Sequence, residues 1–132
     1  MRLLGLDVGT RRIGVAVSDE LGIAAHALRT VARTGNARDA ETVAALLRET
    51  EAVAVVVGVP EGSGEEKRVR GFVEVLRGRL PCPVHTVDES DTTVEAEAVL
   101  LQADLSRRRR KQVIDRLAAA HILERYMRKA PA

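Results

Sequence analysis

The chain has 132 residues, of which 45% are hydrophobic, with a formal net charge of +2 and a pI of about 9.1. This length fits one domain with its own core and is too short for two full lobes. No stretch is typical of a signal peptide or a membrane-spanning helix, and the single cysteine, Cys82, excludes both a disulfide framework and a cysteine zinc site. We therefore expect one cytoplasmic domain over residues 1–132, with no membrane partner.

The N-terminal part of the chain predicts three consecutive strands. Two apolar runs, residues 3–6 and 13–17, flank a polar break with Gly9 and two arginines, a pattern typical of a hairpin, and residues 23–33 form a third strand. Asp7 follows the first run directly, where a buried carboxylate would need a partner. Gly9 permits a tight turn or the close approach of a ligand. Asp7 therefore either lies beside a ligand or only caps the turn.

Helices and strands alternate in the next part of the chain. Helical spacing of apolar residues predicts the helices, and short apolar runs rich in β-branched residues predict the strands. In chain order, these elements cover residues 36–50, 52–57, 65–79 and 84–87.

Two further helices complete the prediction. Thr92 or Thr93 can cap a helix over residues 94–102, and Ser106 can cap a last helix that ends near Arg128. The order βββαβαβαα predicts an α/β fold. Its sheet is mixed and five-stranded, with three antiparallel meander strands followed by two parallel strands, and helices cover its faces.

Several carboxylates are expected at one end of this sheet. Asp7 ends the first strand, Asp88 and Glu89 follow the fifth, and sites in open α/β sheets lie beyond the carboxyl ends of the strands. Asp115 shares a side of the last helix with apolar residues that should face the sheet. Such a cluster suits Mg²⁺ or Mn²⁺, and two ions about 4 Å apart can promote phosphodiester cleavage. The alternative is that each acid is a turn cap or a surface charge.

Basic residues gather in the hairpin and at the start of the last helix. Arginine supplies 18 of the 21 cations, and a cationic run at a helix N-terminus is unfavourable for the helix dipole, so we interpret it as a phosphate-binding cluster. A disordered basic loop is the alternative. With Phe72 and Tyr126 as the only aromatic residues, a general single-strand binder is disfavoured. The candidate nucleic-acid-binding residues are Arg11, Arg12, Arg107, Arg108, Arg109, Arg110 and Lys111.

Four stretches, taken in order, resemble the YqgF/RuvX family of ribonuclease H-like proteins. They are LLGLDVGTRRIGVAVSD, AVVVGVP, VDESDTTVEA and KQVIDRLAAAHILERYM, and together they span nearly the whole chain. The resemblance implies a ribonuclease H-like fold and a metal-dependent nuclease site. It implies Asp7, Glu89 and Asp115 as catalytic residues that bind two Mg²⁺ or Mn²⁺ ions, and Asp88 is a further candidate ligand.

The same resemblance implies two candidate substrates, the 5′ end of precursor 16S ribosomal RNA and four-way DNA junctions. We favour structured RNA, because junction resolution needs two coordinated cuts and normally a symmetric dimer. The protein is expected to be a monomer or a homodimer. Two other classes stay open. One is an actin-like ATPase or sugar kinase, which shares the Asp-x-Gly-Thr turn but needs two lobes, and the other is a catalytically silent RNA-binding module.

Overall fold

The structure is a computed structural model that describes residues 1–89 and 107–129. The strands are β1 (Leu3–Val8), β2 (Arg12–Ser18), β3 (Ala25–Ala32), β4 (Ala54–Val59) and β5 (Val84–Asp88). The helices are α1 (Asn36–Thr50), α2 (Glu66–Arg79) and α4 (Arg107–Lys129). The predicted helix over 94–102 and the cap at Ser106 lie outside the described residues.

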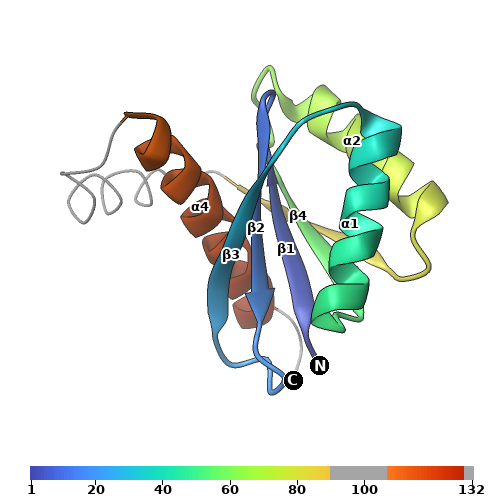
Figure 1. The fold of residues 1–132 in the computed structure, drawn as a ribbon, viewed down its shortest axis with the longest axis vertical. Coiled ribbons are helices and arrows are strands. Elements are labelled where there is room, and N and C mark those ends of the chain that lie inside the picture. Colours follow the sequence, from blue (N-terminus) through green and yellow to red (C-terminus); the bar gives the residue numbers. More distant parts are fainter. Residues whose placement is uncertain (90–106, 130–132) are drawn as a thin grey trace.

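The strands form one mixed sheet in the order β3-β2-β1-β4-β5 (Figure 1). β1 and β2 pair antiparallel, as do β2 and β3, whereas β1, β4 and β5 run parallel to one another. This arrangement confirms the predicted ribonuclease H-like topology. In such a sheet the carboxyl ends of β1, β4 and β5 share one edge, which is where a site is expected.

Two strand predictions were wrong at their ends. β3 covers Ala25–Ala32 rather than 23–33, and β4 covers Ala54–Val59 rather than 52–57. At the start of β4 the chain still turns after α1, because Glu51 has a left-handed φ of 60°. The Val53 N–H then donates to the carbonyl oxygen of Arg2 at 2.9 Å, which brings the chain into the sheet.

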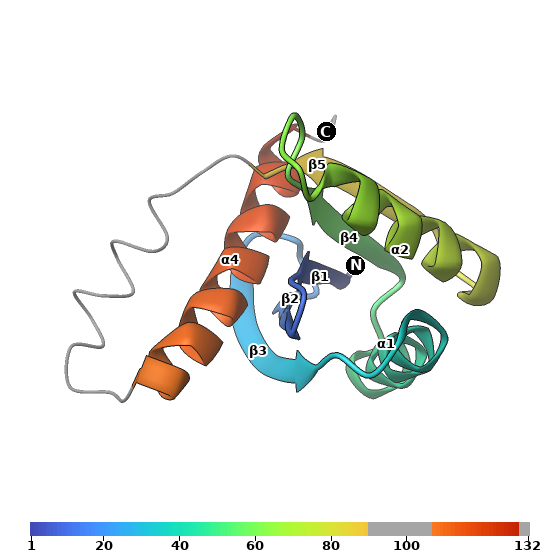
Figure 2. The same cartoon turned by 90° about the horizontal axis from the view of Figure 1, so that it is seen from above.

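The two faces of the sheet carry different side chains and different helices. α1 and α2 cover one face and α4 covers the other (Figure 2). In β1, the alternation of side chains directs Leu4, Leu6 and Val8 into the core beneath α1 and α2. The intervening residues Gly5 and Asp7 therefore face α4. The prediction of helices on both faces is confirmed.

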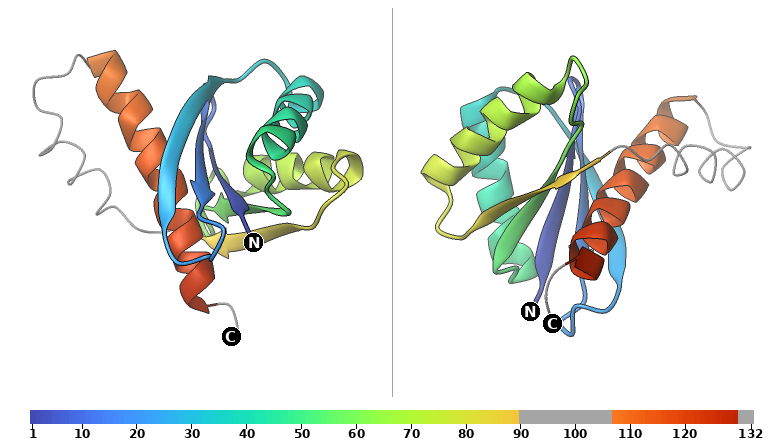
Figure 3. Two further views of the ribbon diagram at one scale, coloured as in Figure 1. Left: turned by 60° about the horizontal axis from the view of Figure 1, so that its bottom comes forward. Right: turned by 180° about the vertical axis from the view of Figure 1, so that it is seen from behind.

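Helix α4 crosses the sheet from the β3 edge toward β5 (Figures 2 and 3). Near its start, the Thr30 hydroxyl of β3 donates to the carbonyl oxygen of Gln112 at 2.8 Å. Near its end, Arg125 Nη1 donates to the carbonyl oxygen of Asp88 in β5 at 2.7 Å. Between these points Ala119, Ile122 and Leu123 are buried against the sheet. None of the described helices is both long and apolar enough to cross a membrane.

Glycines let α4 approach the sheet closely. A Cβ at Gly5 would lie 2.5 Å from the side chain of Leu123, and one at Gly58 would lie 2.4 Å from the side chain of Ile122. The closest approach is at Gly14, where a Cβ would lie only 1.9 Å from the carbonyl oxygen of Asp115. The absence of side chains at these three glycines therefore sets the distance of α4 from β1, β2 and β4.

Candidate active site

Asp7 lies near the carboxyl end of β1, on the face that α4 covers. Its cross-strand partner in β2 is Gly14, which is the residue that touches the backbone of Asp115. The sheet register and this close contact therefore bring Asp7 and Asp115 together, although 108 positions separate them in the sequence. Burial is the main cause that raises the pKa of Asp7, and the negative charge of Asp115 raises it further.

Glu89 follows β5 directly and its carboxyl group meets that of Asp7 in a side-chain hydrogen bond. Burial, followed by the charge of Asp7, raises the pKa of Glu89 to about 9. Burial also raises the pKa of Asp7. The two groups thus share a proton at neutral pH, with protonated Glu89 donating to the carboxylate of Asp7.

Two arginines near this carboxyl pair offset part of its negative charge. The charge of Arg68 on α2 lowers the pKa of Asp7, and the charge of Arg125 on α4 lowers the pKa of Glu89, but in both cases burial outweighs the arginine. Arg68 also donates hydrogen bonds to the backbone carbonyls of Val8 and Gly9, and Arg125 also donates one to the carbonyl of Asp88. Burial therefore outweighs these two neighbouring cations in setting the protonation of the acid pair.

Asp115 completes the predicted set of acids, but its carboxylate is engaged elsewhere. Arg12 Nε donates to Asp115 Oδ2 at 2.7 Å. Across residues 1–89 and 107–129, no three acidic, histidine or cysteine side chains are close enough together to hold a metal ion. The carboxyl groups of Asp7 and Glu89 thus meet as predicted. The carboxylate of Asp115 interacts with Asp7 only through its charge, because its side chain is bound to Arg12.

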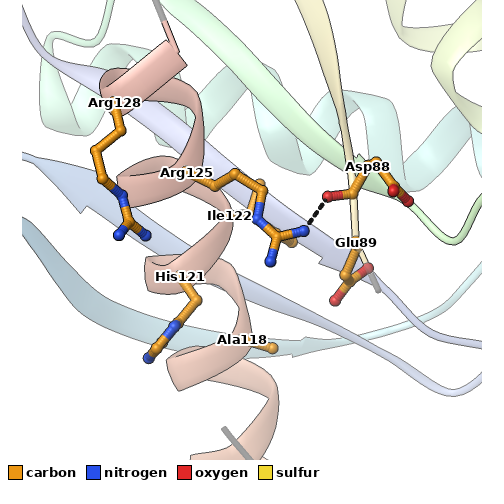
Figure 4. Close-up of a pocket in the computed structure, with 7 residues that line it drawn as sticks. All are labelled: Asp88, Glu89, Ala118, His121, Ile122, Arg125 and Arg128. Carbon is orange, nitrogen blue, oxygen red and sulfur yellow. Dashed lines mark hydrogen bonds between the residues drawn. The ribbon is translucent and has the colours of Figure 1, made fainter. Parts of the chain in front are cut away.

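The structure also separates Asp88 from Glu89, which the sequence could not do. Adjacent strand residues point to opposite faces, and Figure 4 shows the carboxylate of Asp88 directed away from α4. Its Oδ1 atom is buried and accepts no hydrogen bond from the described residues. Glu89 is consequently the acid that meets Asp7, while Asp88 supplies a backbone carbonyl to Arg125.

The predicted basic residues fall into two groups. Arg11, Arg12 and Lys111 line one open pocket together with Gly9, Thr10 and Asp115. Of the remaining residues in the run, Arg109 is exposed and Arg110 is half-buried, and the side chains at 107 and 108 lie outside the description. The hairpin and the start of α4 therefore do present cations on one surface, next to Asp115.

A second pocket lies on the other side of the acid pair, between β5 and the later turns of α4 (Figure 4). Its lining residues are Asp88, Glu89, Ala118, His121, Ile122, Arg125 and Arg128. Glu89 is thus reachable from solvent on the side of α4.

Two arginines that sequence reasoning missed hold the turn after Asp7. Arg68 donates to the carbonyl oxygens of Val8 and Gly9, both at 3.1 Å, and Arg33 Nη1 donates to Gly9 at 3.0 Å. Arg33 is itself held by Asp39 through a 2.7 Å ion pair and lies over the ring of Phe72. No local pattern marks Arg68, since its contacts join residues about 60 positions apart.

The acid pair has the chemistry that a divalent cation requires. Two carboxyl groups that face each other and share a proton would both ionise if a cation replaced that proton. Carboxylate oxygens are the ligands that Mg²⁺ and Mn²⁺ prefer. The residues present therefore fit a metal ion at Asp7 and Glu89, with Asp115 within electrostatic reach.

The sequence matches known proteins along almost its whole length. The family model described as "RuvX: Holliday junction resolvase" matches residues 1–129. A protein of Moorella thermoacetica named "Putative pre-16S rRNA nuclease" is 46% identical over 132 residues, covering 96% of this chain and 94% of the relative. A protein of Halothermothrix orenii with the same name is 41% identical over 132 residues, with the same coverage of both chains.

Solved structures share the fold at low sequence identity. The chain of Thermus thermophilus RuvC in complex with a Holliday junction substrate matches with a TM-score of 0.56 and 18% identity, covering 97% of this chain and 95% of that chain. The Fowlpox virus resolvase in complex with Holliday junction DNA matches with a TM-score of 0.60 and 10% identity, covering 97% of both chains. At these identities the likeness concerns the fold alone.

Proposed function

The chain belongs to the RuvX family, and on that premise we propose that it is a metal-dependent endonuclease that hydrolyses phosphodiester bonds in nucleic acid. The observation that carries the proposal is the contact between the carboxyl groups of Asp7 and Glu89 at the carboxyl ends of parallel strands. Buried acids that share a proton are costly to the fold, and such groups gather at functional sites. A charge partner that arrives with substrate or metal accounts for their retention.

Different residues of the site have different roles in the proposed hydrolysis of phosphodiester bonds. Asp7 and Glu89 would hold Mg²⁺ or Mn²⁺, with Asp115 as a third carboxylate. When bound, the cation supplies Lewis-acid stabilisation of charge on the phosphate and on the leaving oxygen. Arg11 and Lys111 in the open pocket are placed to bind the phosphate backbone. The turn after Asp7 is kept in position by the arginines that bind its carbonyls.

For the substrate, we propose the 5′ end of precursor 16S ribosomal RNA. The names of the relatives from M. thermoacetica and H. orenii support this choice. A four-way DNA junction is the second candidate, favoured by the description of the family model and by the fold likeness to T. thermophilus RuvC. Junction resolution would require a symmetric dimer, so the two candidates differ in assembly as well as in substrate.

A direct test is to offer both substrates to the purified protein in the presence of Mn²⁺. A precursor 16S RNA fragment and a four-way DNA junction are incubated in parallel with wild type, Asp7→Asn and Glu89→Gln. Glu74→Gln is the matched control for Glu89→Gln, because Glu74 is an exposed acid on α2 whose ion pair with Arg77 lies at the surface. We expect cleavage of the RNA by wild type and Glu74→Gln, and loss of cleavage in both site variants.

Three other outcomes would change the assignment. Symmetric nicking of the junction with the RNA untouched would identify a resolvase. Undiminished cleavage by Asp7→Asn would refute the role of the acid pair. RNA binding without any cleavage or Mn²⁺ affinity would identify a catalytically silent RNA-binding module.

A further inference from the structure

Asp115, the third acid of the proposed metal site, forms an ion pair with Arg12. Arg12 Nε lies 2.7 Å from Asp115 Oδ2, on the β2 side of the Asp7–Glu89 pair. A carboxylate whose oxygen is bound to a guanidinium is a poor metal ligand. The structure therefore shows the site with two acids facing each other and the third one held back by an arginine.

We propose that Arg12 is a positioning residue that keeps Asp115 from the metal until a nucleic-acid phosphate binds the Arg12 guanidinium. Release of Arg12 leaves the Asp115 carboxylate free to join Asp7 and Glu89. Substrate binding and metal binding are thereby coupled through one side chain. This inference rests on the proposed function, since it assumes a metal at the acid pair.

The surroundings of the ion pair allow this exchange. Both side chains are partly open to solvent, with relative exposures of 28% for Arg12 and 23% for Asp115. An ion pair this open is worth only about 1 kcal/mol, so a competing phosphate can break it. Arginine binds phosphate through two parallel hydrogen bonds, which makes a phosphodiester an effective competitor for Arg12.

The direction from which a phosphate would arrive is also defined. Arg12 lines an open pocket with Arg11, Lys111 and Asp115, so its guanidinium already lies among other cations. An incoming phosphate that binds Arg11 and Lys111 comes within the same pocket as Arg12. Three cations in that pocket then share the phosphate charge, while Asp115 loses its partner.

The backbone beneath Asp115 does not need to move during the exchange. The carbonyl of Asp115 lies directly on Gly14, where even a Cβ would be only 1.9 Å away. Gly14 is the cross-strand partner of Asp7. The Asp115 backbone is thus anchored beside Asp7, and the proposed exchange calls only for a change of side-chain rotamers.

The coupling predicts a measurable effect on metal affinity in the absence of catalysis. In nucleic-acid-free protein, Arg12→Gln should bind Mn²⁺ at least about fivefold more tightly than wild type, the lower end of typical coupling between sites. Arg11→Gln is the matched control, because it removes the same charge one residue away and leaves the Asp115 ion pair in place. Titration calorimetry with MnCl₂ measures the affinities, and circular dichroism checks that each variant is folded.

A second arm measures the coupling itself with a short phosphorothioate RNA that resists cleavage. The RNA should raise the Mn²⁺ affinity of wild type by a similar factor, after the titration of RNA alone is subtracted. It should have no such effect in Arg12→Gln, in which Asp115 is already free. In the double variant Arg12→Gln/Asp115→Asn, the gain in Mn²⁺ affinity over wild type should disappear.

The outcomes separate this inference from the proposed function. Equal Mn²⁺ affinities for Arg12→Gln and Arg11→Gln, or weaker binding by Arg12→Gln, would overturn the role of Arg12 even if Asp7→Asn abolishes Mn²⁺ binding. Mn²⁺ binding that is unchanged by Asp7→Asn would overturn the metal site at the acid pair, and the inference with it. Tighter binding by Arg12→Gln alone, with loss of the RNA effect, is the expected result.

Discussion

The shared proton between Asp7 and Glu89 predicts that the metal-free protein loses stability as the pH rises. Burial, followed by the charge of Asp7, raises the pKa of Glu89 from 4.5 to about 9. An acid whose pKa is higher in the folded state than in the unfolded state stabilises the fold below its unfolded pKa. That contribution declines as the pH rises toward the folded pKa, so the sensitive window runs from about 4.5 to about 9.

Within that window the magnitude follows from proton linkage. The folded protein holds one more proton than the unfolded chain, so each pH unit lowers the free energy of unfolding by about 1.4 kcal/mol. Between pH 5.5 and pH 7.5 the expected loss is therefore about 3 kcal/mol. This is a large part of the 5–15 kcal/mol that is typical of a whole domain.

Urea unfolding followed by circular dichroism at pH 5.5, 6.5 and 7.5 in EDTA measures the loss. Glu89→Gln should lose less than half as much stability over this range as wild type, because its amide cannot ionise and can still donate to Asp7. Glu74→Gln should behave as wild type. Mg²⁺ should flatten the wild-type dependence by replacing the proton. Equal slopes for wild type and Glu89→Gln would refute the shared proton.

Three further substitutions test how the site is supported. Gly14→Ala should destabilise the protein by about 2 kcal/mol or more in thermal unfolding and weaken Mn²⁺ binding, because its Cβ would overlap the backbone of α4; Gly71→Ala, an open position on α2, is the control and should be neutral or stabilising. Burial raises the pKa of Asp39, but the Arg33 ion pair and hydrogen bonds from Thr34 and Gly35 outweigh it and lower the pKa, so its contribution is present above pH 3.8 and lost in stronger acid. Asp39→Asn should cost about 3 kcal/mol at pH 7 in urea unfolding and lack that acid-dependent loss. Arg68→Met should lower kcat/KM for the cleaved substrate by more than Arg70→Met, which removes only surface ion pairs; equal values would refute the support of the turn by Arg68.

The three helices within residues 1–89 and 107–129 were predictable from the sequence to within a residue, whereas strand ends were not. α1 covers Asn36–Thr50 as predicted and α2 begins one residue later than predicted, because helical spacing of apolar residues is a strong local signal. The apolar run begins at residue 52, before β4, and continues into the strand without a break. The sequence therefore does not show where strand pairing starts. That point is set by the hydrogen bond that the Val53 N–H donates to the carbonyl oxygen of Arg2, just before β1.

The site was predictable as a location but not as a set of contacts. An acid at the end of an apolar strand indicates Asp7, and the topology places Asp88 and Glu89 at the same edge. The direction of each side chain after β5 depends on strand alternation at its last residue, which the sequence does not fix. The pairing of Arg12 with Asp115 joins residues 103 positions apart, so no local pattern could reveal it.

The contrast between the two faces of β1 explains why the local sequence pattern indicates this site only weakly. On the α1 and α2 face, Leu4, Leu6 and Val8 bury large apolar side chains, which stabilise the fold. On the α4 face, Gly5 and Asp7 contribute almost no packing, and glycine in a strand weakens it. The same weakening applies to β2, where Gly14 leaves room for the backbone of Asp115. Small residues on this face thus let α4 pack close enough to place Asp115 beside Asp7. A larger side chain at position 14 would push α4 away and disrupt the site while the sheet itself still forms.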